Sequence, residues 1–199
     1  MVSSVIIITS AVAVFGLLHS LVASLRIKAL AEKWLGLRIF RFYRLAYNLI
    51  TVVLLFLILG MVLTLHDRII YIIPEPWVYI ILVIQGVAAL CAVWGISQTG
   101  LSHFLGFKQL KKAEENAGPT HLALDGFYHW MRHPAYTFSL IFMWLLPMHT
   151  VNTLTFDVAA TLYILVGIYF EEKKLVSEFG QVYLDYQKRT PMLVPFLKK

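Results

Sequence analysis

The sequence has a single cysteine, Cys91, and few charged residues, and both shortages narrow the class of protein. One cysteine permits no intramolecular disulfide and no thiolate metal cluster. Charged residues make up 14% of the 199 residues and hydrophobic residues 59%, which is too apolar for a soluble domain of this length. The sequence therefore predicts a single integral membrane domain.

Local motifs of the common nucleotide-binding and hydrolase folds are also missing. The sequence contains no GxGxxG, no GxxxxGK[ST] and no GxSxG. Dinucleotide binding by a Rossmann fold, phosphate-loop chemistry and hydrolase chemistry therefore lack their signatures. The net charge of +6 arises from basic residues that flank apolar stretches, so it indicates no nucleic-acid partner.

Long apolar stretches are what the sequence has instead. Five of them are candidate transmembrane helices, at residues 5–25, 45–65, 77–97, 134–148 and 154–170. The fourth is shorter than the roughly 20 residues that a straight crossing needs, and we expect it to form a hairpin with the fifth. The predicted fold is an all-α integral membrane helical bundle of about five transmembrane helices, followed by a C-terminal helical segment.

The basic residues are distributed unevenly between these stretches. With five spans, all of the 17 Lys and Arg residues except Arg68 fall on one side of the membrane. The positive-inside rule then predicts a multi-pass protein with its N-terminus outside and its C-terminal segment in the cytoplasm.

Arg132-His133-Pro134 directly precedes the fourth apolar stretch. Pro134 suits the first turn of a helix, because a backbone N–H at that position would have no helical partner. Arg132 and His133 are therefore expected at the boundary between water and lipid, beside the positive end of the helix dipole. This arrangement is typical of an anion site.

Glu171 and Glu172 lie where the fifth span leaves the membrane, on the same side as Arg132. Carboxylates at the C-terminal end of a helix oppose the helix dipole and need partners near lipid. Two interpretations remain open. The two acids are solvated and balanced by Lys173 and Lys174, or one of them steadies Arg132 or accepts hydrogen bonds from a polar ligand.

Two histidine features have competing interpretations. His129 and His133 have the HxxxH spacing of metal ligands on a helix, but the other histidines are scattered, and no metal site is predicted. His19 lies inside the first span, where an ionisable residue indicates function. A neutral histidine bonded to a neighbouring helix is an equal alternative, so the role of His19 stays open.

The C-terminal part of the chain resembles a known enzyme family. The run from His121 to Tyr136, followed by Glu171-Glu172-x-x-Leu175 and Phe179-Gly180-x-x-Tyr183, is similar to the isoprenylcysteine carboxyl methyltransferase family. The resemblance implies a small multi-span membrane enzyme that uses S-adenosylmethionine without a Rossmann domain. It also implies a cytoplasmic cofactor pocket over the last spans, covered by the C-terminal segment.

Segments nearer the N-terminus resemble a narrower group. Residues 15–24, 41–48 and 103–107 are similar to the bacterial branch that contains methanethiol S-methyltransferases and NnrU-like proteins. This branch implies a bacterial inner membrane and a small thiol, or another lipophilic molecule, as the methyl acceptor.

The resemblance, carried over position by position, implies which residues line the S-adenosylmethionine site. They are His121, Tyr128, Arg132, His133, Tyr136, Glu171 and Glu172. Arg132 and the helix that follows it would hold the methionyl carboxylate, while a glutamate would meet amino or ribose hydroxyl groups. Arg132 and Glu171 are therefore the residues expected to carry the reaction.

The whole chain, 1–199, is expected to be one methyltransferase-like domain, with three spans in 1–97 and the cofactor-binding core in 98–199. Two other functions remain open. One is a non-enzymatic NnrU-like membrane protein concerned with haem or respiratory assembly, and the other is an NADPH-dependent reductase of the sterol reductase type. The methyl acceptor and the oligomeric state are not determined by the sequence.

Overall fold

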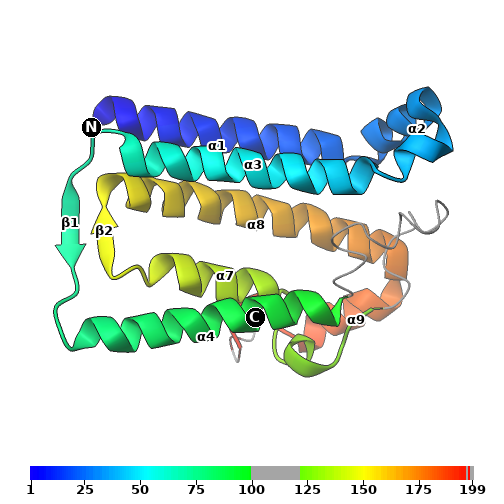
Figure 1. The fold of residues 1–199 in the computed structure, drawn as a ribbon. Coiled ribbons are helices and arrows are strands. Elements are labelled where there is room, and N and C mark those ends of the chain that lie inside the picture. Colours follow the sequence, from blue (N-terminus) through cyan, green and yellow to red (C-terminus); the bar gives the residue numbers. More distant parts are fainter. Residues whose placement is uncertain (100–121, 196, 198–199) are drawn as a thin grey trace. The chain divides into compact units, whose positions relative to one another are not determined.

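The computed structural model describes residues 1–99, 122–195 and 197. Its helices and strands are α1 (Val2–Ala23), α2 (Leu25–Phe40), α3 (Tyr43–Thr64), β1 (Ile69–Ile72), α4 (Trp77–Gln98), the 3₁₀ helix η2 (Gly126–His129), α7 (Pro134–Trp144), β2 (Met148–Thr150), α8 (Val151–Phe179) and α9 (Gln181–Arg189). Helices make up most of the described chain, as the sequence predicts (Figure 1).

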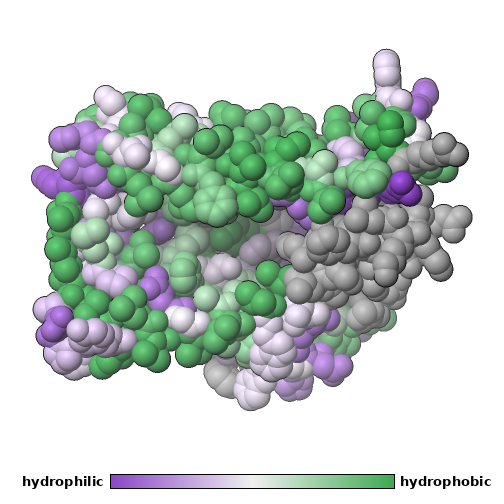
Figure 2. Space-filling view, in the orientation of Figure 1, coloured by the Kyte–Doolittle hydropathy of each residue, from purple (hydrophilic) through white to green (hydrophobic). Residues whose placement is uncertain are grey.

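Four of the described helices, α1, α3, α4 and α8, are long and apolar enough to cross a membrane. The first three have 22 residues each. At about 1.5 Å per residue, such a helix matches the roughly 30 Å hydrocarbon core of a bilayer. Large apolar side chains such as Leu63 and Leu90 are 82% and 73% exposed, and hydrophobic residues cover much of the visible surface (Figure 2). The integral membrane helical bundle is confirmed.

The fourth expected span, 134–148, differs from the prediction. The helix there, α7, has 11 residues and ends at Trp144, and β2 begins at Met148. A helix of this length rises only about 16 Å and is too short for a straight crossing. Among the described residues, four helices are therefore long enough to be full-length spans, and α7 is a shorter helix that packs against α4.

Contacts along the chain divide the described residues into two compact units. The first contains Met1–Arg68 and Val151–Ala159, and the second contains Ile69–Thr99, 122–150 and 160–195. Helix α8 therefore contributes its first residues to one unit and the rest to the other.

In the first unit, α1 packs beside α3 (Figure 1). Near the end of α1, the Tyr43 hydroxyl donates a hydrogen bond to the Val22 carbonyl at 2.7 Å. Near its beginning, Ser4 donates to the carbonyl of His66 at 2.8 Å. These bonds fix the two ends of an antiparallel helix pair.

In the second unit, α4 packs against α7. The helices approach closely at Gly95, where a Cβ would lie 3.2 Å from the backbone nitrogen of Ala135. The Gln85 side chain donates to the Phe142 carbonyl at 2.9 Å, further along the same contact. The strands β1 and β2 pair in antiparallel fashion, and neither was predicted from the sequence. The close approach at Gly95 holds the start of α7 against the C-terminal end of α4.

Candidate functional site

The turn before α7 and the charged part of α8 meet in the second unit. Pro134 occupies the first turn of α7, as predicted, and His133 precedes it as the N-cap residue. Arg132 Nε donates to Glu172 Oε1 at 2.6 Å, and the two side chains are only 9% and 16% exposed. Of the two interpretations for this acidic pair, the one in which a glutamate steadies Arg132 therefore holds for Glu172.

Glu172 accepts hydrogen bonds on both carboxylate oxygens. Besides Arg132, its Oε1 lies 3.2 Å from His133 Nε2 and accepts from the Tyr183 hydroxyl at 3.4 Å. Its Oε2 accepts from the side-chain amide of Gln187 at 3.1 Å. A carboxylate that is largely removed from water is costly unless it is paired and hydrogen-bonded, and these four partners meet that need.

The Arg132 guanidinium also binds the C-terminal segment. Its Nη1 donates to the carbonyl oxygens of Gln187, at 3.2 Å, and Thr190. Both are at or near the C-terminal end of α9, where helix carbonyls lack helical partners. Arg132 therefore joins three chain segments: the turn before α7, the charged part of α8 and the end of α9.

Backbone hydrogen bonds strengthen the same junction. The N–H groups of Arg132 and His133 donate to the carbonyls of Pro191 and Met192 at 2.9 and 3.1 Å. Gly180, where φ is +55°, follows the last residue of α8 and lets the chain turn into α9. The C-terminal segment thus lies directly against the Arg-His-Pro turn.

Buried tyrosines complete the site. The Tyr186 hydroxyl donates to the Tyr128 carbonyl at 2.5 Å, and the Tyr128 hydroxyl donates to the Gly95 carbonyl at 3.4 Å. Burial raises the pKa of Tyr128 to about 12, and the negative charge of Glu171 adds to that shift. Burial also raises the pKa of Tyr183 and of Tyr186. All three phenols therefore remain protonated donors at neutral pH.

Glu171 differs from its neighbour because its side chain is 43% exposed. One carboxylate oxygen lies 4.0 Å from His133 Nδ1, and the Tyr136 side chain interacts with the same carboxylate. The rings of His133 and Tyr136 lie 5.8 Å apart. Glu171 is therefore the exposed carboxylate of the candidate site, beside the buried ring of His133, whereas the Glu172 side chain is only partly exposed.

The sequence analysis missed Gln98 at the end of α4. Its Oε1 is buried and, within the part of the chain that the structure describes, has no hydrogen-bond partner. The amide lies against Gly126, where φ is +61° and where a Cβ would overlap the Gln98 side chain. A polar residue directly after the third apolar stretch was the signal that could have identified it. Gln187 and Thr190 were also missed. Both bind Arg132 through backbone carbonyls, which every residue carries, so the residue type gives no signal.

The structure brings most of the predicted site residues together. Those in contact or close to one another are Tyr128, Arg132, His133, Tyr136, Glu171 and Glu172. His121 lies outside the described residues, so its place in the site remains a prediction. Whether this cluster binds a cofactor is likewise a prediction that the geometry alone does not test.

The other histidines that the sequence singled out have different surroundings. His129 lies beside the Trp130 ring at 5.9 Å. Within residues 1–99 and 122–195, no three His, Cys, Asp or Glu side chains form a group that could hold a metal ion. His19 belongs to the first unit and lies between the rings of Phe15, at 5.6 Å, and Tyr47, at 5.0 Å.

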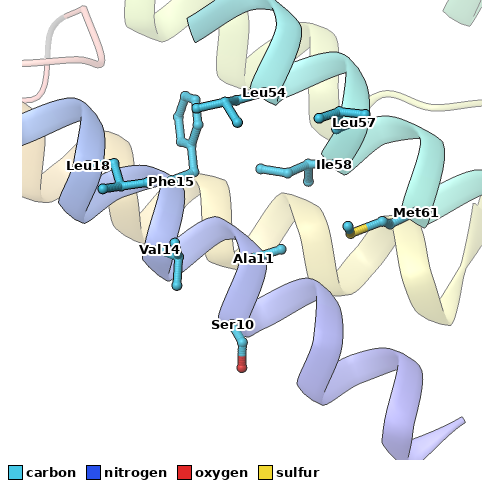
Figure 3. A pocket seen from close by; sticks show the side chains of 9 residues that line it. All are labelled: Ser10, Ala11, Val14, Phe15, Leu18, Leu54, Leu57, Ile58 and Met61. Carbon is cyan, nitrogen blue, oxygen red and sulfur yellow. The ribbon is translucent and has the colours of Figure 1, made fainter. Parts of the chain in front are cut away.

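The first unit also contains an apolar pocket of about 300 Å³ between α1 and α3 (Figure 3). Its lining residues are Ser10, Ala11, Val14, Phe15, Leu18, Leu54, Leu57, Ile58 and Met61. Only Ser10 among them is polar, so the pocket suits an alkyl chain and provides no charged partner for an ionic ligand. The Arg132 cluster, which consists of Tyr128, Arg132, His133, Tyr136, Glu171 and Glu172, belongs to the other unit.

Comparisons with known proteins identify relatives of the chain. It is 38% identical over 103 residues to methanethiol S-methyltransferase of Crocosphaera subtropica, covering 50% of this chain and 40% of that protein. It is 47% identical over 70 residues to methanethiol S-methyltransferase 2 of Bradyrhizobium diazoefficiens, covering 35% of this chain and 27% of that protein. With protein-S-isoprenylcysteine O-methyltransferase of Tribolium castaneum it shares 31% identity over 103 residues, or 50% of this chain and 35% of that protein.

The matches therefore span less than half the length of each of these relatives. No protein-family model and no solved structure matches the chain. The resemblance predicted from the sequence is nevertheless confirmed by the names of these proteins. Over about half of its length, the chain is similar to methanethiol S-methyltransferases and to isoprenylcysteine O-methyltransferases.

Proposed function

We propose that this protein is an integral membrane methyltransferase that uses S-adenosylmethionine and methylates a small thiol or another lipophilic acceptor. Two groups of relatives support methyl transfer as the reaction. One group is named methanethiol S-methyltransferase and the other protein-S-isoprenylcysteine O-methyltransferase. Apolar helices that cross the membrane suit an acceptor that dissolves in lipid.

The observation that carries the proposal is the contrast between two adjacent carboxylates. Glu172 is 16% exposed and hydrogen-bonded, whereas Glu171 is 43% exposed beside His133. S-adenosylmethionine presents an ammonium group and ribose hydroxyl groups, which are donors that a carboxylate binds. In the proposed complex, Glu171 contacts the methyl donor while Glu172 remains paired with Arg132.

The described residues fit such a ligand in a second respect. Gln98 Oε1 is a buried acceptor for which no partner is present within the described ranges. A buried polar atom without a partner is costly, so a ligand N–H or O–H group that reached it would be favoured. Tyr128 and Tyr136 would line the same surface, and His121 is included on the resemblance alone.

In this proposal, Arg132 acts by positioning. Its Nε binds Glu172, and its Nη1 binds two carbonyls of the C-terminal segment. The main effect of Arg132 is therefore to hold the C-terminal segment against the site. This differs from the expectation that Arg132 binds the methionyl carboxylate directly. Loss of Arg132 would weaken donor binding through the displaced C-terminal segment.

The chemistry requires alignment more than proton transfer. Bound S-adenosylmethionine supplies a methyl group on a positively charged sulfur, which is transferred by in-line displacement. With a thiol acceptor, the thiolate would be the nucleophile after its proton had passed to water, and S-adenosylhomocysteine would be the leaving group. The residues of the site bind and orient the donor, and the phenols of Tyr128, Tyr183 and Tyr186 stay neutral.

We further propose that the site faces the cytoplasm of a bacterial cell. Basic residues flank the Arg132 end of the spans, and the positive-inside rule places such segments in the cytoplasm. With that orientation, soluble S-adenosylmethionine reaches the site from water.

Calorimetric titration of the detergent-purified protein with S-adenosylhomocysteine tests this function. We expect saturable binding that Glu171→Gln weakens by about tenfold or more, because hydrogen bonds to a charged group contribute about 1.5–3 kcal/mol. Glu178→Gln on the same helix is the matched control and should bind normally, since Glu178 pairs with Lys174. Absence of binding by folded protein would reject the methyltransferase function, and haem and NADPH would be the next ligands to titrate.

A further inference from the structure

Helix α2 joins the membrane-spanning helices α1 and α3 of the first unit, yet most of its residues with a described burial are exposed. Phe40, at its end, is the buried exception. Several of the exposed residues are large and apolar: Trp34 is 84% exposed and Leu30 is 51% exposed. Such side chains on a helix that barely packs against the protein need another apolar environment.

The position of α2 places it at a membrane surface. Helix α1 ends at Ala23 and α3 begins at Tyr43, and the Tyr43 hydroxyl bonds to the carbonyl of Val22 at 2.7 Å. The ends of two spans therefore lie at the same level, and α2 is attached at both of its ends to that level (Figure 1). A short helix held in this way between the ends of two spans is expected at the level of the lipid headgroups.

Three large apolar residues in the first portion of α2 form a stripe. Ile27, Leu30 and Trp34 follow the spacing i, i+3 and i+7, which places them on one face of a helix. The regular part ends before Gly36, where φ is +70° and ψ is 158°, so the stripe belongs to the first portion of α2. Ala29 is exposed on the opposite face.

Basic residues border this stripe. Arg26 and Lys33 are seven positions apart and therefore share one side of the helix, next to Leu30 and Trp34, and both are exposed. An apolar stripe with a tryptophan and with lysine or arginine at its edge is typical of a helix that lies in the bilayer interface. Long basic side chains there reach the phosphates while their stems contact lipid.

We propose that α2 is an interfacial helix that binds the acidic headgroups of the bilayer. Ile27, Leu30 and Trp34 insert into the outer part of the acyl layer, and Arg26 and Lys33 bind lipid phosphates. The occupant of this face is an anionic phospholipid surface, because the two flanking spans hold α2 at that surface and the charges are complementary. This surface is separate from the Arg132 cluster and does not depend on the proposed methyltransferase activity.

Spin labels on the two faces of α2 test the insertion. Leu30→Cys and Ala29→Cys, each in full-length protein carrying Cys91→Ala, are labelled and reconstituted in vesicles of phosphatidylcholine and phosphatidylglycerol. We expect the label at position 30 to collide mainly with oxygen, which dissolves in lipid, and the label at position 29 with a water-soluble nickel chelate. Equal access at both positions, or protection of position 30 from both reagents by a second copy of the chain, would overturn the proposal.

Binding of acidic lipid is tested with spin-labelled phosphatidylglycerol. The double variant Arg26→Gln and Lys33→Gln should lower the preference for phosphatidylglycerol over phosphatidylcholine by about fivefold or more, since each basic residue near an acidic surface contributes about 1 kcal/mol. Arg68→Gln, outside α2, removes one exposed charge as the control and should leave the preference unchanged. An equal loss in the control, or no loss in the double variant, would contradict a headgroup site on α2.

Discussion

Asn152 near the start of α8 and Glu172 near its other end both bind several groups, but they do so in different units and with opposite chemistry. Asn152 is fully buried, and its side-chain amide donates to the carbonyls of Val62 and Leu65 at 3.3 and 3.1 Å. Glu172 instead accepts hydrogen bonds from charged and polar side chains, Arg132 first among them. A neutral amide therefore completes the end of α3 in one unit, and a charge joins three segments in the other.

This difference agrees with the proposed location of the functional site. Carbonyls at the end of a helix need donors in any stable fold, so the Asn152 contacts have a structural explanation. A buried ion pair stabilises a fold only weakly compared with apolar packing, and its presence is better explained by a role in positioning. In the second unit the ion pair lies directly behind the accessible carboxylate of Glu171.

The largest effect is expected from Arg132→Ala. This change leaves the partly buried Glu172 carboxylate without its cation, and we expect a loss of up to about 3 kcal/mol of unfolding free energy, the lower end of the cost for a fully buried pair. Thermal unfolding in detergent should show a large drop in midpoint. The double variant Arg132→Met with Glu172→Leu removes both charges and should recover part of the loss, whereas a single variant as stable as the parent would disprove the burial argument.

A smaller loss is expected from Asn152→Leu. The carbonyls of Val62 and Leu65 lose their donor, at a cost of about 1–3 kcal/mol. Thermal unfolding measures the loss, and binding of S-adenosylhomocysteine to the folded fraction should stay unchanged. If the fully folded variant bound S-adenosylhomocysteine more weakly than the parent, Asn152 would not have a purely structural role.

Tyr186→Phe removes the hydroxyl that bonds to the Tyr128 carbonyl. We expect a loss of about 0.5–1.5 kcal/mol in unfolding free energy. Tyr183→Phe is the matched control, because its hydroxyl lies 3.4 Å from Glu172 and makes a weaker bond. A larger loss of unfolding free energy in Tyr183→Phe than in Tyr186→Phe would show that the Tyr183 hydroxyl forms the stronger bond, contrary to this prediction.

The smallest effect concerns alkaline pH. Burial raises the pKa of Tyr128 to about 12, above its value of about 10 in an unfolded chain. The unfolded state therefore loses this proton first as pH rises, and the stability that Tyr128 contributes is complete below about pH 10 and lost toward pH 12. Unfolding midpoints between pH 9 and 11 should fall less steeply in Tyr128→Phe, and identical slopes would contradict the shift.

Much of the fold could be predicted, because lipid imposes long apolar stretches. The spans expected at 5–25, 45–65 and 77–97 correspond to α1, α3 and α4 within a few residues. The length of α7 could not be predicted in the same way, since apolarity continues beyond Trp144 where the helix ends. The pairing of β1 with β2 depends on contacts between distant segments, which local patterns do not specify.

The charged residues of the candidate site could be predicted from the sequence, and so could Tyr128 and Tyr136 through the family resemblance, but Gln98 and Thr190 could not. Arg132 and the two glutamates were recognisable because charges near lipid need partners. Which glutamate pairs with Arg132 depends on the rotation of α8, and that selects Glu172. Gln98 and the carbonyl of Thr190 carry no charge, so their roles emerge only from the folded geometry.

The most direct test of the proposed function is methyl transfer itself. Reconstituted protein is incubated with S-adenosylmethionine labelled in its methyl group and with methanethiol, and labelled dimethyl sulfide is measured in the headspace. Longer-chain thiols replace methanethiol in parallel samples. The account predicts labelled thioether from at least one thiol, reduced by about tenfold or more in Glu171→Gln and unchanged in Glu178→Gln. Folded protein that labels no acceptor, or a Glu171→Gln variant as active as the parent, would contradict it.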